Sequence, residues 1–143
     1  MILEIVTPEK IVLSEEIDQL TAPTTTGEIT VLPKHVGLLT KIISGELTIK
    51  KGAKTEFFAI TGGFLEVEKD KITILADYAV RSEEIEVAKA IEAQKQAEKL
   101  MKDAKEKASE KDFALAESEL RRAILELKVA HRRRKTHTSI PTA

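Results

Sequence analysis

The sequence contains neither cysteine nor tryptophan, and aromatic residues make up only 3% of it. Without cysteine the chain has no disulfide framework, no thiolate nucleophile and no thiolate metal ligand. Its three histidines are scattered and lack the spacing of a zinc site. We therefore expect neither a metal centre nor cysteine-based catalysis.

Long apolar runs are also missing. No stretch approaches the roughly 20 apolar residues that a membrane-spanning helix needs. The N-terminus enters an alternating strand pattern without a basic start or an apolar segment, so no signal peptide is expected. We expect any association with a membrane to go through a partner protein.

The net charge is close to zero, at −1, although charged residues make up 33% of the chain. Residues 1–80 contain eight Lys or Arg against twelve Asp or Glu, whereas residues 81–143 contain fifteen against twelve. The charge of the whole chain therefore does not indicate nucleic-acid binding. One alternative function stays open, a free-standing nucleic-acid-binding module that uses the basic C-terminal helix.

Residues 1–81 predict an antiparallel β-sandwich or barrel, because short alternating runs are separated by Gly or Pro. Ser44-Gly45 form a break of hairpin size, and Gly62-Gly63 predict a turn or bulge between two strands. No helical pattern lies between the strands, so parallel crossovers are not expected. The expected strands are residues 3–6, 17–22, 29–32, 38–43, 46–50, 56–61, 64–67 and 72–75.

The same alternation predicts the core of this domain. Every second residue of a strand faces one side of the sheet, so the apolar residues at that spacing are expected to be buried. They are numerous enough for one small domain. The expected core residues are Ile5, Leu20, Ala22, Val31, Leu47, Ile49, Phe58, Ile60, Leu65, Val67, Ile72 and Ile74.

Residues 82–135 predict two charged helices in an antiparallel hairpin, and residues 136–143 a flexible tail. Ser82 resembles an N-cap for a helix of residues 83–107, and Ser109 with Asp112 resembles a capping box for the second helix. The expected apolar stripes are Ile85, Ala88, Ile91, Ala93, Ala97, Leu100, Ala104 and Ala108, followed by Phe113, Ala116, Leu120, Ile124 and Leu127. A face of alanines holds a partner weakly, so the hairpin either leaves its own domain easily or stays packed on it.

The chain contains no catalytic constellation that we recognise. Gly62-Gly63 lack the Lys and Ser or Thr that would follow in a phosphate-binding loop. His35 has no adjacent Ser, Cys or paired carboxylate that would make it a general base. We therefore expect a protein that is not an enzyme and that requires no cofactor.

Three motifs together resemble one family. Residues 27–39 read GEITVLPKHVGLL, residues 58–77 read FAITGGFLEVEKDKITILAD, and residues 81–85 read RSEEI. In this order before a charged hairpin they resemble the epsilon subunit of F-type ATP synthases, from Leu3 to about Ala130. The resemblance implies a β-sandwich with a C-terminal helical hairpin, in a non-catalytic subunit of the central rotor stalk.

The resemblance also implies partners and a location. Such a subunit binds the gamma subunit and the c-ring, couples ring rotation to the catalytic head, and restrains ATP hydrolysis through its hairpin. It is peripheral on an energy-transducing membrane, either on the cytoplasmic side of a bacterial plasma membrane or on a plastid thylakoid. We further expect one face of the sandwich to carry more exposed apolar surface than a monomer needs, where gamma would bind.

Two groups of site residues follow from the family. A loop with a rigid proline start resembles the region that contacts the c-ring, and its alternative role is to pack on its own sandwich. Its residues are Pro33, Lys34, His35, Val36 and Leu38. Some bacterial members bind ATP through an Ile/Leu-Asp-x-x-Arg-Ala motif and two arginines on the second helix. This chain has Glu86, Lys89 and Arg122 as candidate contacts, but Glu126 at the other arginine position, so ATP is expected to be a weak regulatory ligand at most.

A third group concerns inhibition. In this family the second helix meets acidic segments of the beta subunits, within the head of alpha and beta subunits. Opposite charges steer such docking, with Arg122 beside the apolar stripe expected to be the best desolvated. The alternative is a basic helix end that only stabilises the helix. The candidate residues are Arg121, Arg122, Lys128, Arg132, Arg133, Arg134 and Lys135.

Overall fold

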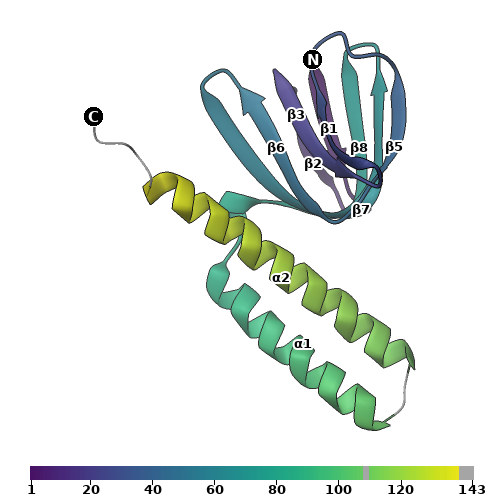
Figure 1. Cartoon of the computed structure of the whole chain (residues 1–143), viewed down its shortest axis with the longest axis vertical. Coiled ribbons are helices and arrows are strands. Elements are labelled where there is room, and N and C mark those ends of the chain that lie inside the picture. Colours follow the sequence, from purple (N-terminus) through teal and green to yellow (C-terminus); the bar gives the residue numbers. More distant parts are fainter. Residues whose placement is uncertain (108–109, 139–143) are drawn as a thin grey trace. The chain divides into compact units, whose positions relative to one another are not determined.

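The computed structural model describes the backbone of residues 1–107 and 110–138 and the side chains of residues 1–103 and 113–131. The chain divides into two compact units, Met1–Ser82 and Glu83–Ala143 (Figure 1). The first unit consists of strands and the second of two helices, as the sequence predicts. The strands are β1 (Ile2–Val6), β2 (Ile11–Glu16), β3 (Gln19–Thr24), β4 (Gly27–Val31), β5 (Leu38–Ile42), β6 (Gly45–Lys51), β7 (Lys54–Glu68) and β8 (Lys71–Arg81).

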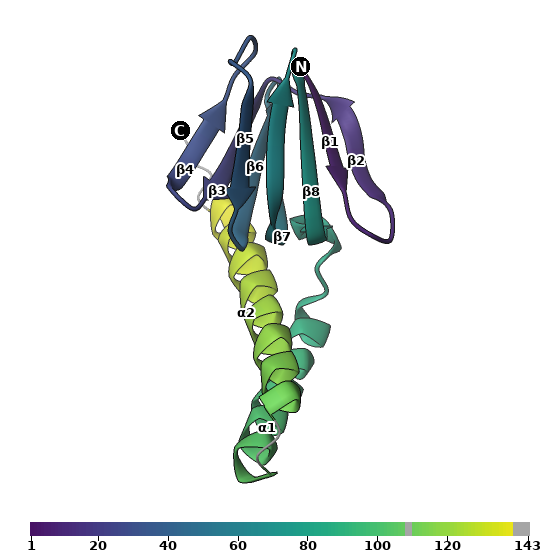
Figure 2. The ribbon, with the colours of Figure 1, turned by 90° about the vertical axis from the view of Figure 1, so that its right-hand side faces the viewer.

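The strands pair in the order β2-β1-β8-β7-β5-β3-β4, and β6 pairs with both β3 and β7 (Figure 2). All these pairs are antiparallel except β1 with β8, which are parallel. The sandwich is thus antiparallel as predicted, except for this one pair, and no helix lies between any two of its strands. A helical crossover is needed where consecutive strands are parallel, but six other strands connect β1 to β8.

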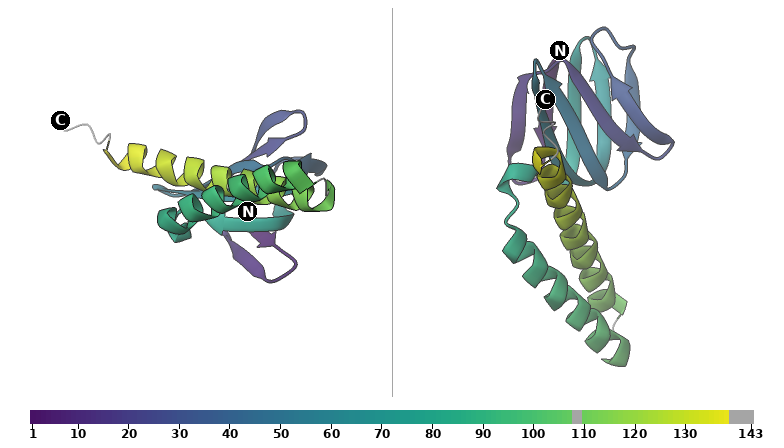
Figure 3. Two further views of the ribbon diagram at one scale, coloured as in Figure 1. Left: turned by 90° about the horizontal axis from the view of Figure 1, so that it is seen from below. Right: turned by 60° about the vertical axis from the view of Figure 1, so that its left-hand side comes forward.

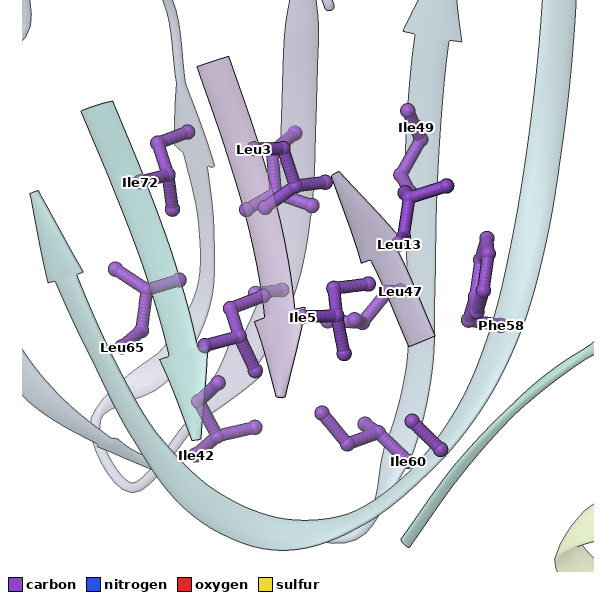
Figure 4. Packing of buried hydrophobic residues seen from close by; sticks show 14 of the residues in the cluster. Leu3, Ile5, Leu13, Ile42, Leu47, Ile49, Phe58, Ile60, Leu65 and Ile72 are labelled. Carbon is purple, nitrogen blue, oxygen red and sulfur yellow. The ribbon is translucent and has the colours of Figure 1, made fainter. Parts of the chain in front are cut away.

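Strand β7 runs through Gly62 and Gly63, so the two strands expected on either side of them are one. Up to this point Phe58 and Ile60 face the core, whereas beyond it Leu65 and Val67 do. The inward side thus changes from even to odd residues where φ is 49° at Gly62 and 146° at Gly63. The two glycines let the β7–β8 ribbon bend around the core, and Figure 4 shows this curved strand.

Strands β5 and β6 do not form the hairpin expected at Ser44-Gly45. Ile42 pairs with Gly63 and Gly45 pairs with Ile60, so the two strands follow one another along β7. Between β5 and β6 the chain bends at the place where β7 bends, and this bend explains why the strand pattern is interrupted at Ser44-Gly45. Strand β2 was not expected, because its sequence IVLSEE does not alternate and only Leu13 in it is buried.

All twelve residues predicted for the core are buried. Figure 4 shows several of them, among them Ile5, Leu47 and Phe58. Leu3, Leu13, Ile17 and Ile42 join them in one cluster, and Leu38 packs against it. Full burial of one such side chain contributes about 1.5–3 kcal/mol. The sandwich unit therefore contains its own hydrophobic core.

The second unit consists of α1 (Val87–Lys107) and α2 (Glu110–Thr138), preceded by a 3₁₀ turn, η1 (Ser82–Glu84). The first α-helix thus begins at Val87 and not after Ser82, because the 3₁₀ turn occupies the segment where the cap was expected. The amide of Ala90 donates to the carbonyl of Glu86 at 3.0 Å, which begins the helix. The predicted capping box is not tested, because Ser109 and the side chain of Asp112 lie outside the described residues.

The two helices lie side by side and antiparallel (Figure 3). The expected stripe of α1 is wrong at four of its described positions, because Ala88, Ile91, Ala93 and Leu100 are exposed. The side chains of Ala104 and Ala108 lie outside the described residues. The least exposed positions instead repeat at intervals of three and four residues: Val87, Ala90, Gln94, Ala97 and Met101. Alanines occur on several sides of this helix, so their spacing alone does not identify the packed face.

The stripe predicted for α2 is nearly correct. Phe113, Ala116, Leu120 and Leu127 are buried or half-buried, whereas Ile124 is 46% exposed and Ala123 is buried in its place. With Ala123 the spacing is again three and four residues. This is the repeat of a coiled-coil seam between two long helices.

Candidate interaction sites

The predicted partner-facing loop, here called the 32–37 loop, is built on a tight turn. The amide of His35 donates to the carbonyl of Leu32 at 3.1 Å. Proline fixes φ of Pro33 near about −65°, and φ of Lys34 is +64°. These features define a type II turn, in which the third residue has a positive φ and is usually Gly or Asn.

The 32–37 loop presents apolar side chains to solvent. Val36 is 76% exposed and Leu32 is 51% exposed. Of the predicted residues, Pro33 and Lys34 are also exposed and His35 is partly exposed. Leu38 instead packs against the hydrophobic core and belongs to β5. An exposed apolar pair on a fixed turn is suited to contact another surface.

Sequence reasoning missed the residue that holds this loop. The backbone amide of Lys34 donates to Oδ1 of Asp70 at 3.1 Å. Asp70 lies 36 positions later, in the turn between β7 and β8, so no local signal links the two residues.

A second surface lies on the solvent side of the sheet and is here called the apolar row. Phe64 pairs with Leu75, Leu75 with Val6, and Val6 with Ile11, so four apolar residues stand side by side across β7, β8, β1 and β2. Phe64, Leu75 and Ile11 are exposed by more than half, as is Leu39 on β5. The sandwich therefore has exposed apolar side chains on the solvent side of four neighbouring strands.

A third cluster lies at the end of β8 and was not predicted. Glu56 faces the core opposite Ile49 and is only 8% exposed. Its carboxylate is paired with Nζ of Lys54 and lies 3.8 Å from Nη2 of Arg81. The guanidinium carbon of Arg81 also lies 5.4 Å from the centre of the Phe58 ring. Arg81, the last residue of β8, is thereby fixed to the sandwich.

The predicted ATP-contact residues occur in ion pairs. Nζ of Lys89 lies 3.1 Å from Oε2 of Glu86, and Nε of Arg122 lies 3.5 Å from Oε1 of Glu126. Both pairs join residues three or four positions apart on a helical segment. Such pairs are worth only a few tenths of a kcal/mol, about 0.2–0.5, so they do not lock the side chains in place.

The predicted inhibitory residues lie along α2. The side chain of Arg121 pairs with Glu117 and is 77% exposed, whereas that of Arg122 is 51% exposed. Arg122 is thus the more covered of the two, and Lys128 is exposed. The side chains of Arg132, Arg133, Arg134 and Lys135 lie outside the described residues. The helix continues to Thr138, so it includes the first residues of the expected tail.

The described residues contain no group of three or more His, Cys, Asp or Glu that could hold a metal ion. Among them, no helix is both long and apolar enough to cross a membrane.

Both units match family models. Residues 1–82 match the model described as ATP synthase, Delta/Epsilon chain, beta-sandwich domain. Residues 83–131 match the model described as ATP synthase, Delta/Epsilon chain, long alpha-helix domain. The boundary between the models coincides with that between the two compact units.

Whole-chain relatives lead to the same family. The ATP synthase epsilon chain of Dehalococcoides mccartyi is 47% identical over 133 residues, covering 93% of this chain and 94% of the relative. That of Herpetosiphon aurantiacus is also 47% identical, over 132 residues, covering 92% and 95%.

Solved structures agree on the fold. A chain in the structure of the Euglena gracilis mitochondrial ATP synthase (OSCP, F1 and c-ring) matches with a TM-score of 0.71 and 25% identity, covering 92% of this chain and 80% of that one. A chain in the Tetrahymena thermophila central stalk and c-ring structure matches with a TM-score of 0.52 and 22% identity, covering 59% and 68%, and supports the fold alone. The matches along both units together place this chain in the family of ATP synthase epsilon chains.

Proposed function

We propose that this epsilon chain is a non-catalytic part of the central rotor stalk, bound to the gamma subunit and to the c-ring. In this role it couples proton-driven rotation of the ring to ATP synthesis in the catalytic head. The observation that carries the proposal is the match of both units to epsilon chains over 93% of the sequence. The nucleic-acid-binding alternative has no comparable support.

Two surfaces of the sandwich suit the two rotor contacts. The 32–37 loop, with exposed Leu32 and Val36, is assigned to the c-ring. The apolar row, centred on Phe64 and Leu75, is assigned to gamma, since a stable subunit contact covers apolar area of this kind. The chain would reach the membrane only through these partners, as a peripheral subunit.

The helical hairpin is assigned to the control of ATP hydrolysis. Its seam contains alanines such as Ala90, Ala97 and Ala116, which bury little area, beside larger residues such as Phe113 and Leu120. We expect the alanines to lower the cost of opening the hairpin, which would present the basic side of α2 to acidic segments of the beta subunits. Arg122, half-covered in the free chain, is the residue we expect to be most desolvated there.

ATP is proposed as a weak regulatory ligand only. Lys89 lacks the forked guanidinium that binds phosphate in a bidentate manner, and its ammonium already faces the Glu86 carboxylate. The Glu126 carboxylate beside Arg122 opposes the approach of a triphosphate. Both features lower the affinity expected for a nucleotide on this hairpin.

The absence of cysteine provides a direct test of the rotor assignment, because any introduced thiol is unique in the chain. Val36→Cys and Leu75→Cys would each be labelled with a photoreactive maleimide and assembled into the ATP synthase. We expect the first to crosslink to the c subunit and the second to gamma. Thr55→Cys, at the other end of β7, is the matched exposed control. An assembled complex in which Val36→Cys reaches no c subunit contradicts the assignment of the loop.

A further inference from the structure

The turn of the 32–37 loop contains a residue in an unfavourable conformation. Lys34 has a φ of +64°, in a type II turn position that usually holds Gly or Asn. A side chain with a Cβ costs roughly 1–2 kcal/mol in this conformation, so the turn needs support from elsewhere. The hydrogen bond of the turn itself uses the amide of His35, which leaves the amide of Lys34 to an outside acceptor.

The outside acceptor is the carboxylate of Asp70, whose Oδ1 lies 3.1 Å from the Lys34 nitrogen. Asp70 and Lys69 have φ values of +65° and +46°, as in the two-residue hairpin turn that joins β7 to β8. The carbonyl of Asp70 also accepts the amide of Ile2 at 3.0 Å. The carboxylate is therefore mounted on a turn that is tied to β1 as well as to its own strands.

From this geometry we propose that Asp70 is a positioning residue, which fixes the 32–37 loop for its contact with the c-ring. The proposal rests on the proposed function for its choice of partner. Leu32 and Val36 flank the turn and are its exposed apolar residues. Fixing Lys34 between them fixes both, so the loop is organised before it meets its partner, and less ordering entropy is lost on contact.

Four variants of the full-length chain isolate the contribution of the carboxylate. Asp70→Gly removes the acceptor and suits the positive φ, so the β7–β8 turn keeps its conformation. Asp70→Asn keeps an acceptor oxygen and tolerates the same backbone. Lys69→Gly is the matched control, because it changes the neighbouring turn residue and leaves the carboxylate intact. Lys34→Gly in the Asp70→Gly background removes the strain that the carboxylate offsets.

The first readout is hydrogen exchange of the Lys34 amide, measured by NMR on the isolated chain. We expect about fivefold faster exchange in Asp70→Gly, the factor that corresponds to one net hydrogen bond of about 1 kcal/mol. Asp70→Asn should retain most of the protection, and Lys69→Gly should retain all of it. Unchanged exchange in Asp70→Gly would overturn the proposal, whatever the loop binds.

The second readout is the yield of photocrosslinking from Val36→Cys to the c subunit in the assembled complex. We expect a severalfold lower yield with Asp70→Gly, recovery with Asp70→Asn, and substantial recovery when Lys34→Gly is added. A purely structural role of Asp70 would lower the thermal midpoint and leave this yield unchanged, which would refute positioning. If Val36→Cys alone reaches no c subunit while Lys34 exchange still depends on Asp70, the partner assignment fails and the internal contact stands.

Discussion

Replacing Gly63 by alanine tests whether the bend of β7 around the core requires a glycine at this position. An added Cβ would lie 2.0 Å from the carbonyl oxygen of Leu75 and 3.0 Å from the Cα of Ala76, and both are backbone atoms of β8. A normal contact requires a displacement of about 1 Å or more in a strand paired on both sides, and φ of 146° adds strain of about 1–3 kcal/mol. With the ladder hydrogen bonds weakened as well, we expect a loss of about 3–5 kcal/mol in the free energy of unfolding.

The adjacent glycine supplies the control. Gly62 has a φ of 49°, and a Cβ added there meets nothing within 4 Å. Gly62→Ala should therefore cost only about 1–2 kcal/mol, part of which is returned by the stiffer unfolded chain. Urea unfolding followed by tyrosine fluorescence reports on the sandwich alone, because Tyr78 in β8 is the single tyrosine and tryptophan is absent. If the two variants lose the same free energy of unfolding, the argument that Gly63 is required by its close approach to β8 is refuted.

Four further predictions concern the rest of the chain. Glu56→Ala should lower the free energy of unfolding by about 1–2 kcal/mol, because Arg81 loses its carboxylate partner, and no change in tyrosine-monitored urea unfolding would contradict this. Deletion of residues 84–143 should leave a domain that unfolds cooperatively on heating and still binds gamma, and loss of the cooperative transition would refute its autonomy. Replacing five arginines of α2 by alanine should relieve inhibition of ATP hydrolysis in reconstituted membranes without impairing assembly; these are Arg121, Arg122, Arg132, Arg133 and Arg134. Truncation after Tyr78 should relieve the inhibition at least as much. Unchanged ATP hydrolysis by the truncated complex would mean that the hairpin does not inhibit it. Calorimetry should find ATP affinity weaker than micromolar, and micromolar or tighter binding would contradict the argument from Lys89 and Glu126.

The sequence predicts those parts of the fold in which the burial of side chains depends on the geometry of a single strand or helix. Ile72 and Ile74, for example, are buried and alternate with less buried residues, because side chains on a strand face opposite sides in turn. The corner at Gly62-Gly63 breaks this rule, since the inward side changes within one strand. A two-residue interruption looks the same in sequence whether the chain turns back or bends and continues.

Long-range contacts account for most of what was missed. Nothing near Lys34 indicates that its amide binds Asp70. Alternation with Phe58 and Ile60 puts Glu56 on the inward side of its strand, but nothing near Glu56 indicates that Arg81 lies beside it. The parallel pairing of β1 with β8 is also a long-range contact, because six strands separate the two in the sequence. The packed face of α1 was missed for a different reason, because alanine is small enough to stand on either the exposed or the buried side.

Strand β8 is followed by η1 and then by α1, so the covalent connection to the helices leaves the sandwich at Arg81. Within the sandwich β8 pairs with β7 from Lys71 to Arg81 in antiparallel orientation, and with β1 in parallel orientation from Lys71 to Leu75 only. Tension along β8 loads these hydrogen bonds in shear, those to β7 near Arg81 and those to both neighbours in the first half of the strand. The connection is therefore expected to resist tension, so that a pull on the helices would leave the sandwich folded.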